Sequence, residues 1–269
     1  MDIKGSKIGI VGGSGWLGGA IASAMLDTGV VAPSTLSLSY RSHRPDRFED
    51  AFWTVDNAVI AERSDVIILS VRPQDWPLLH FSARGKLVIS VMAGVRLSDL
   101  GTQLQTARAV RSLPNAAAEV RASFTPWIAT AGITDSDRKI IDAIFNACGC
   151  HAEMRSEGEI DYFTGLTGTG PAFPALLAEA MMTDALAQGI DRKTARRAVD
   201  AVFVGAARLL EKNGSCPSDT IRTFLDYRGT TAAGIEAMVT AGFRKAVACG
   251  LAAAKESSVH MGQPPRHLG

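Results

Sequence analysis

The opening segment, residues 7 to 25, constrains what this chain can fold into more than any other stretch. Its short apolar run from Ile8 to Val11 is typical of a strand buried on both faces of a sheet. The run stops at glycine, and Gly13, Gly15 and Gly18 then have the GxGxxG spacing. This spacing allows a tight turn, a close approach of the backbone to a pyrophosphate, and close packing of a helix on the strand.

A helix is predicted directly after this turn. Apolar residues recur at helical spacing from Leu17 to Met25, so the helix N-terminus and its free N–H groups would face an anion. Because the glycines stand between a strand and a helix, the segment indicates a dinucleotide site rather than a turn that binds nothing. Gly12 adds one further glycine ahead of the triplet.

The loop after the second predicted strand indicates NADP rather than NAD. That strand, Thr35 to Tyr40, ends about 20 residues beyond the glycines, where a Rossmann unit selects its cofactor. A carboxylate there would accept the ribose hydroxyls of NAD, but the chain has Arg41 and Ser42. A guanidinium and a hydroxyl suit the additional phosphate of NADP. The alternative is ordinary solvated surface charge.

Apolar runs farther along predict a doubly wound, mostly parallel sheet, and hence an α/β Rossmann domain. After a short helix that Asp56 is predicted to cap, strands are expected at residues 65–71, 86–92, 107–113, 125–130 and 151–154. Ligands of such sheets lie outside the carboxyl ends of the strands. That rule places three of these ends around the nicotinamide half of the cleft, at residues 70–73, 92–94 and 113–115.

From residue 157 onward the pattern is helical, with helices predicted at residues 171–188, 192–212, 218–225 and 230–257. We therefore expect residues 1–156 to form the nucleotide-binding domain and residues 157–269 to form an all-α domain. Alanines recur along the last predicted helix, and small side chains let helices approach closely. Because the apolar helices have few strands to cover them, the second domain predicts a homodimer or a larger homo-oligomer.

Charge and cysteine content exclude several classes of function. The chain carries 28 basic and 27 acidic residues, which leaves no basic footprint for nucleic acid and no polybasic patch for a membrane. Charged residues interrupt the alanine-rich C-terminal stretch, so we expect a cytoplasmic protein without a membrane span. We expect buried free thiols and no metal site, because zinc and redox spacings are missing among Cys148, Cys150, Cys216 and Cys249.

Over nearly its whole length the chain also resembles the pyrroline-5-carboxylate reductase family, the NAD(P)H-dependent enzymes that make proline. Besides the glycine turn, Asp56 and Asn57, the resemblance rests on five segments: SVRPQ (70–74), SVMAGV (90–95), RSLPNAAAEV (111–120), DYFTGLTGTGPAF (161–173) and GTTAAGIEAMVTAGFR (229–244). It implies an NADPH-binding Rossmann domain followed by a helical dimerisation domain, with each active site completed by the partner subunit. It also implies hydride transfer from the nicotinamide to the imine carbon of a five-membered ring.

The resemblance assigns site residues position by position. Thr230 is the candidate catalytic residue, since its hydroxyl would bond the imine nitrogen or the substrate carboxylate. The substrate-binding candidates are Thr167, Gly168, Thr169, Arg228, Gly229, Thr230 and Thr231. The cofactor-binding candidates are Gly13, Ser14, Gly15, Trp16, Leu17, Gly18, Arg41, Ser42, Asn57, Val71, Arg72, Pro73, Ala93, Gly94, Pro114 and Asn115.

Two departures from the family pattern bear on function. The additional glycine at the cofactor turn is similar to the turn of deazaflavin-dependent NADP reductases. Where the family typically has Ser-Pro-Gly ahead of Gly-Thr-Thr, this chain has Asp226, Tyr227 and Arg228, and the Asp226 carboxylate would repel a substrate carboxylate. Three hypotheses follow: an NADPH-dependent reductase of pyrroline-5-carboxylate, a reductase of another cyclic imine or ketimine, and a non-catalytic NADP-binding dimer.

Overall fold

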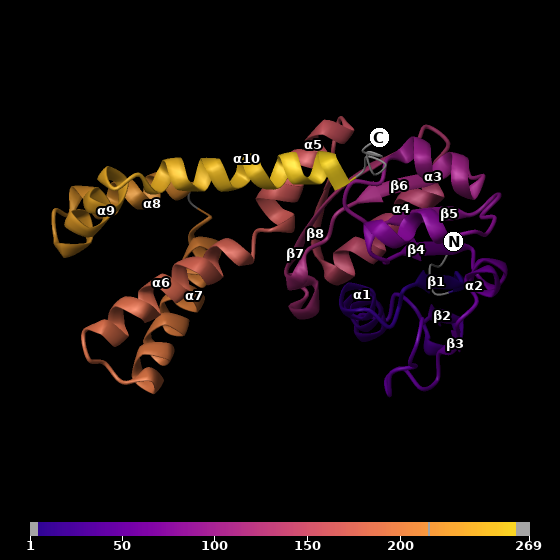
Figure 1. Ribbon diagram of the computed structural model, residues 1–269, viewed down its shortest axis with the longest axis horizontal. Helices are drawn as coiled ribbons and strands as arrows, with labels where there is room; N and C mark the ends of the chain where they lie inside the picture. The colour runs from indigo at the N-terminus through magenta and orange to yellow at the C-terminus, as the bar shows by residue number, and fades with distance from the viewer. Residues whose placement is uncertain (1–4, 215, 262–269) are drawn as a thin grey trace, which may run out of the picture. The chain divides into compact units, whose positions relative to one another are not determined.

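The computed structural model describes residues 5–214 and 216–261 of the chain. These residues divide into two compact units (Figure 1). The first unit holds the chain through Thr169 together with the segment from Ala252 onward, and the second holds Gly170–Leu251. The sequence pattern instead predicts one domain boundary between residues 156 and 157. This boundary differs from the division into the two units, and it stays a prediction.

An eight-stranded sheet forms the centre of the first unit. Its order is β3-β2-β1-β4-β5-β6-β7-β8, so the chain runs outward from β1 in both directions, as in doubly wound folds. Neighbouring strands are parallel except β6 and β7, which are antiparallel, and this confirms the predicted sheet. The strands are β1 (Ile8–Val11), β2 (Leu36–Ser39), β3 (Phe52–Thr54), β4 (Val66–Leu69), β5 (Leu87–Ser90), β6 (Ala109–Ser112), β7 (Ser123–Ala129) and β8 (Gly149–Glu153).

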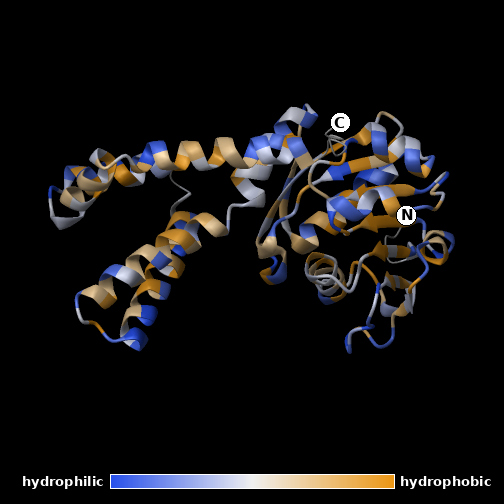
Figure 2. Ribbon diagram, viewed as in Figure 1, coloured by the Kyte–Doolittle hydropathy of each residue, from blue (hydrophilic) through white to orange (hydrophobic). Residues whose placement is uncertain are grey.

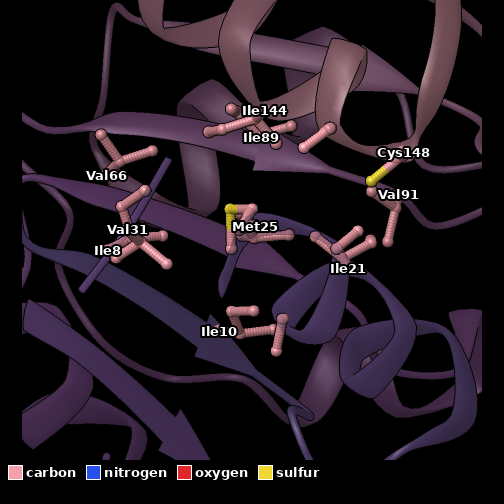
Figure 3. Packing of buried hydrophobic residues seen from close by; sticks show 14 of the residues in the cluster. Ile8, Ile10, Ile21, Met25, Val31, Val66, Ile89, Val91, Ile144 and Cys148 are labelled. Carbon is pink, nitrogen blue, oxygen red and sulfur yellow. The ribbon is translucent and has the colours of Figure 1, made fainter. Parts of the chain in front are cut away.

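Helices cover both faces of this sheet, because the side chains of the central strands alternate between two apolar layers. On one face, Ile10 and Ile89 pack among residues of α1 and α4, including Met25 and Ile144 (Figure 3). On the other face, apolar residues of the same strands pack against α2 and α3. These helices are α1 (Trp16–Asp27), α2 (Asn57–Arg63), α3 (Leu97–Leu104) and α4 (Asp135–Cys148).

The short elements of the first unit went partly unpredicted. The sequence gives no sign of β3, a strand of three half-buried residues that pairs with β2. The predicted cap of α2 is confirmed, because the Asp56 side chain accepts a hydrogen bond from the N–H of Ala58 at 2.8 Å. The remaining helical segments are η2 (Pro33–Thr35), η3 (Pro73–Leu78), η4 (Ala116–Val120), α5 (Glu157–Phe163) and the π-helix η5 (Thr164–Gly168).

A buried arginine joins the sheet to the helices that follow it in the chain. Arg111 of β6 is 1% exposed, and its guanidinium lies 3.2 Å from Glu157 Oε1 and 2.5 Å from Asp161 Oδ1, both on α5. The hydroxyl of Ser258, near the end of α10 (Phe243–Met261), donates to the same Asp161 oxygen at 3.4 Å. The hydrogen bond from Ser258 links the segment from Ala252 onward to α5 within the first unit.

The second unit is all-α, as predicted. Asp191 caps α7 by accepting from the N–H groups of Lys193 and Thr194, and Gly214, at φ 56°, ends it in the left-handed conformation. The helices α6 and α7 pack against each other, as do α8 and α9. They are α6 (Ala172–Ala187), α7 (Arg192–Asn213), α8 (Pro217–Asp226), α9 (Thr230–Thr240) and the first part of α10.

The prediction of one continuous helix over residues 230–257 is wrong. Gly242 has φ 92°, a conformation that side chains oppose and glycine allows, and it separates α9 from α10. Among the described residues, no single helix is long and apolar enough to cross a membrane. The bent pair α9 and α10, at 53°, passes that test of length and composition only when its two helices are taken together.

The cysteines differ from the expectation in their burial. Cys148 is buried, and this burial raises the pKa of its thiol to about 11. The other three are exposed, so the prediction of buried thiols is wrong for Cys150, Cys216 and Cys249. Within the described ranges, no three or more His, Cys, Asp or Glu side chains gather closely enough to hold a metal ion.

Candidate functional site

The glycine turn between β1 and α1 has a shape that excludes side chains. Gly12 has φ 83°, and a Cβ there would lie 2.4 Å from the carbonyl oxygen of Ser70. A Cβ on Gly18 would lie 2.6 Å from the Gly12 carbonyl oxygen, and one on Gly13 would lie 2.8 Å from Leu38 Cδ2. Real Cβ atoms essentially never come this close to backbone atoms, so glycine is required at Gly12 and Gly18, whereas at Gly13 the conflict is with the end of the Leu38 side chain, which can move. The turn therefore presents bare backbone.

Ser39, the last residue of β2, holds this turn in place. Its hydroxyl oxygen accepts from the N–H of Gly12 at 2.9 Å, and its carbonyl oxygen accepts from the N–H of Ser14 at 3.2 Å. After Gly15, α1 begins at Trp16, and among the described residues no side chain caps this N-terminus. The free N–H groups and the helix dipole fit a bound pyrophosphate.

The two large side chains of the turn have different surroundings. Trp16 is 64% exposed, and its indole N–H donates to Glu119 Oε2 at 3.1 Å. Leu17 packs against the apolar layer that contains Met25. Trp16 is therefore open to a ligand, whereas Leu17 belongs to the core.

The loop that follows β2 carries Arg41 and Ser42, and both are exposed. Arg41 Nη1 lies 3.4 Å from Asp75 Oδ1, and Arg72 Nε lies 3.0 Å from Asp75 Oδ2. The hydrogen bond from Arg72, together with the charges of both arginines, holds the pKa of the Asp75 carboxyl below its ordinary value. Asp75 therefore pairs with two of the predicted cofactor-binding residues, Arg41 and Arg72. Sequence reasoning did not identify Asp75.

Sequence reasoning also missed Arg47, which lies farther along the same loop. Its guanidinium donates to the carbonyl oxygens of Ser14 at 3.3 Å and Gly15 at 3.2 Å. The signal that could have found it is its basic side chain in the loop that selects the cofactor. Arg47 contacts the glycine turn directly, whereas Arg41 does not contact it in this structure.

Most other cofactor candidates follow the carboxyl ends of the parallel strands. Because such ends share one edge of a sheet, these residues lie on the same edge as the glycine turn. Asn57 begins α2, and Gly94 has φ 77°, which ordinary side chains rarely adopt. The residues after β4 are Val71, Arg72 and Pro73, those after β5 are Ala93 and Gly94, and those after β6 are Pro114 and Asn115.

Asn115 connects this edge to the segment that holds three of the predicted substrate residues. Its Nδ2 donates to the Thr167 carbonyl oxygen at 2.8 Å, and its Oδ1 accepts from the N–H of Ala117 at 2.9 Å. Thr167 and Gly168 lie in η5, and a Cβ on Gly168 would meet Leu113 Cδ2 at 2.8 Å. Insertions of this π-helical kind are frequent at functional sites.

The hydroxyls of this segment are partly engaged by its own backbone. Thr167 Oγ1 donates to the carbonyl oxygen of Phe163 at 3.1 Å, and Thr169 Oγ1 donates to that of Gly165 at 2.5 Å. Their oxygen lone pairs can still accept a hydrogen bond from a ligand. Accordingly, both threonines are suited to accept from a protonated group rather than to donate to an anion.

The other substrate candidates lie in the second unit, in the turn from α8 to α9. Thr230 and Thr231 open α9 and are exposed, and among the described residues no side chain caps this helix at Gly229. Arg228 has φ 52°, a left-handed conformation that glycine adopts without strain and other residues rarely adopt. This turn therefore has an arginine at a position where glycine would be less strained.

Comparisons with known proteins bear on both parts of the chain. A family model described as pyrroline-5-carboxylate reductase dimerisation matches residues 157–261. A second model, described as NADP oxidoreductase, coenzyme F420-dependent, matches residues 7–94.

Full-length relatives and solved structures give the same family. The chain is 33% identical to a pyrroline-5-carboxylate reductase of Methanosarcina acetivorans over 97% of this chain and 100% of that protein. It is 30% identical to one of Arabidopsis thaliana over 96% of each. A pyrroline-5-carboxylate reductase structure from Coxiella burnetii matches with a TM-score of 0.85 and 26% identity over 96% of this chain and 99% of that chain. The chain belongs to the pyrroline-5-carboxylate reductase family.

Proposed function

We propose that this protein reduces pyrroline-5-carboxylate to proline, with NADPH as the hydride donor. The observation that supports it most directly is the hydrogen bond from Asn115 to Thr167, which joins two of the family's motifs. These motifs lie at the sheet edge that also carries the glycine turn. Relatives that bear the enzyme's name match nearly the whole chain, so both the cofactor part and the substrate part are present.

The cofactor part of the site holds NADPH mainly through backbone. The turn from Gly13 to Gly18 receives the pyrophosphate, and Arg41 and Ser42 receive the additional phosphate. Asn57 contacts the adenosine side, and the strand ends that contain Pro73, Gly94 and Pro114 form the nicotinamide wall. NADPH supplies the hydride, and the protein fixes where that hydride can go.

The substrate part recognises a ring imine with a carboxylate. The N–H groups and hydroxyls at the start of α9, from Gly229 to Thr231, receive the carboxylate, and Thr230 bonds the carboxylate or the imine nitrogen. A protonated imine is already electrophilic, so positioning against the cofactor supplies most of the catalysis. This explains how the site can act without a His or Lys as general acid.

Activity depends on assembly of a homodimer through the second unit. Its described helices expose large apolar side chains, among them Leu176 at 67%, Val202 at 51% and Val204 at 50%. Figure 2 shows apolar residues spread along α6, α7 and α10. Exposed apolar surface on this scale marks a protein interface, and a second copy of the chain is the partner that the matching dimerisation model supports. A molar mass measured in solution tests for the dimer or a larger ring; a monomer would contradict it.

The test of the reaction is a Thr230→Val variant beside a matched Thr240→Val control at the other end of α9. Wild-type protein should oxidise NADPH, followed by absorbance, when pyrroline-5-carboxylate is added. T230V should lower kcat/KM about 10- to 100-fold, the cost of one lost hydrogen bond to a charged group, with the Kd of NADPH unchanged. T240V should match wild type. Tight NADPH binding without turnover of any imine would favour the non-catalytic dimer instead.

A different cyclic imine or ketimine is the second candidate substrate, and the residues ahead of Gly229 favour it. Asp226 and Arg228 bring two charges to a loop that carries Ser-Pro-Gly in the family. Restoring Ser-Pro-Gly at residues 226–228 should then raise activity toward pyrroline-5-carboxylate relative to other imines. An unchanged ratio would rule out this loop as the determinant. The cytoplasmic location stays a prediction, which cell fractionation tests.

A further inference from the structure

We propose that Arg47 recognises the 2′-phosphate of the adenosine ribose and thereby sets the preference for NADPH over NADH. The inference concerns a residue outside the family motifs in the sequence, and it rests on the proposed use of NADPH. It makes Arg47, rather than Arg41 alone, the principal cation of the phosphate site.

The structure gives Arg47 a specific seat on the glycine turn. Its Nη2 lies 3.2 Å from the Gly15 carbonyl oxygen, 3.3 Å from that of Ser14 and 3.5 Å from that of Gly13. Gly19 makes room for this group, because a Cβ there would lie 2.0 Å from Nη2 and 2.3 Å from Cζ. The second glycine of the GG pair in α1 is therefore explained by the arginine that packs against it.

Neighbouring contacts hold the Arg47 side chain at this place. Its Cζ lies 5.2 Å from the centre of the Phe48 ring, a distance at which a guanidinium is attracted to an aromatic face. Phe48 itself has φ 54°, an uncommon conformation for an aromatic residue, and its carbonyl oxygen accepts from the indole N–H of Trp53 at 3.2 Å. The loop therefore keeps Phe48 in a strained backbone conformation beside Arg47, and such strain is typical of functional sites.

The charge of Arg47 is unbalanced within the part of the chain that the structure describes. Arg41 and Arg72 both pair with Asp75, and Arg44 points to the Glu49 carbonyl oxygen at 3.5 Å. Arg47, by contrast, has neutral carbonyl oxygens as its acceptors and no carboxylate within salt-bridge distance among the described residues. Its buried Nε has no acceptor among them either. The Arg47 guanidinium therefore has both a charge and an N–H donor with which it can bind an anion.

The position of the loop identifies which anion. Residues 40–51 connect β2 to β3 at the outer side of the sheet (Figure 1), and the end of β2 is where a Rossmann fold meets the adenosine ribose. NADPH and NADH differ only in the phosphate on that ribose. A cation between this loop and the glycine turn therefore distinguishes the two cofactors by charge, as arginines do in a fork of two hydrogen bonds.

A purely structural role for Arg47 makes a different prediction. If the guanidinium only supported the carbonyl groups of the turn, its loss would distort the pyrophosphate site, which both cofactors use equally. Affinity for NADP⁺ and NAD⁺ would then fall together. Recognition of the 2′-phosphate instead weakens NADP⁺ selectively.

The experiment measures the Kd values of NADP⁺ and NAD⁺ by calorimetry, without substrate, on the full-length protein. Four variants are compared with wild type: Arg47→Gln, which removes the charge; Arg47→Lys, which keeps it; Gly19→Ala, which displaces the guanidinium; and Arg44→Ala, a control. The control removes a charge from the same loop, on a side chain that donates to the Glu49 carbonyl oxygen and not to the glycine turn. Circular dichroism checks that each variant is folded.

R47Q and G19A should each raise the Kd of NADP⁺ about 10- to 100-fold, the range for a charged hydrogen bond, and change that of NAD⁺ less than about threefold. R47K should retain most of the preference, and R44A should leave both values near wild type. Equal losses for the two cofactors in R47Q, or an R44A effect as large as that of R47Q, would overturn the inference. If wild type binds neither cofactor, the proposed function fails as well; if it prefers NADP⁺ and R47Q does so equally, only this inference fails.

Discussion

Replacing Gly12 by alanine should damage the cofactor turn far more than the same change at Gly29. Both glycines have positive φ, 83° at Gly12 and 71° at Gly29, so alanine is strained at either place. They differ in their surroundings, because a Cβ at Gly12 would lie 2.4 Å from Ser70 O, whereas one at Gly29 has nothing within 4 Å. The pair therefore separates conformational strain from steric conflict.

The magnitudes follow from these distances. The left-handed conformation costs an alanine about 1–2 kcal/mol, and Gly29→Ala should lose no more than this. At Gly12 the Ser70 carbonyl must also move by about 1 Å to reach ordinary contact, which disturbs the hydrogen bond from Ser70 N–H to the Val11 carbonyl at 2.9 Å. A buried backbone group left unsatisfied costs about 1–3 kcal/mol more. Gly12→Ala should therefore lower the free energy of unfolding by about 2–5 kcal/mol in all.

Urea unfolding gives the loss of stability, and calorimetry gives the Kd of NADP⁺ for each folded variant. G29A should bind NADP⁺ as wild type does, since Gly29 lies at the far end of α1. G12A should lose stability by at least about 1 kcal/mol more than G29A and bind NADP⁺ at least about tenfold more weakly, because β1 and β4 are pushed apart at the turn. A G12A variant within about 0.5 kcal/mol of G29A, with unchanged affinity, would refute this account of the additional glycine.

Three further predictions concern charged groups and thiols. Asp75→Asn should lower the Kd of NADP⁺ by about two- to fivefold in titrations at low salt, because it frees Arg41 and Arg72, two of the predicted cofactor-binding residues, from their carboxylate partner. Asp137→Asn should cost about 1–3 kcal/mol in urea unfolding at pH 7. Burial raises the pKa of Asp137, but hydrogen bonds from Arg108 and Thr134 outweigh this effect, so the pKa in the folded protein is lowered. The ionised Asp137 therefore contributes to the free energy of unfolding above about pH 4, and this contribution is lost as the pH falls through the pKa of the folded state. The stability of D137N should therefore fall less on acidification than that of wild type. A thiol reagent should label the exposed Cys150 of the native protein and reach Cys148 only after unfolding.

The central sheet could be predicted because strands buried on both faces read as continuous apolar runs. The strands from β1 to β6 that carry such runs, and the helix cap at Asp56, follow local rules of this kind. The strand β3 could not be found, since three half-buried residues leave no pattern. The break at Gly242 was missed because glycine within an alanine-rich run reads equally well as helix interior.

Candidate site residues that lie in sequence motifs could be predicted, whereas contacts that depend on how distant segments pack could not. The glycines and Asn115 stand in recognisable segments, and the structure places them after the expected strands β1 and β6, whereas Asn57 begins α2 after β3, which was not predicted. The seat of Arg47 depends on the missing side chain of Gly19, a contact between residues far apart in the sequence. Likewise, the pairing of Asp75 with Arg41 crosses from the end of β4 to the end of β2. Such contacts follow from the sheet order, which local periodicity does not contain.

The ion-pair network around Arg111 has a consequence for how the protein is made. Ser258, near the end of α10, donates to Asp161, so the unit that binds the cofactor includes residues from both ends of the chain. During synthesis the strands of the sheet leave the ribosome before α10, so Asp161 can accept the hydrogen bond from Ser258 only after α10 has been made. The first unit can therefore complete its contacts only after the second unit has been synthesised.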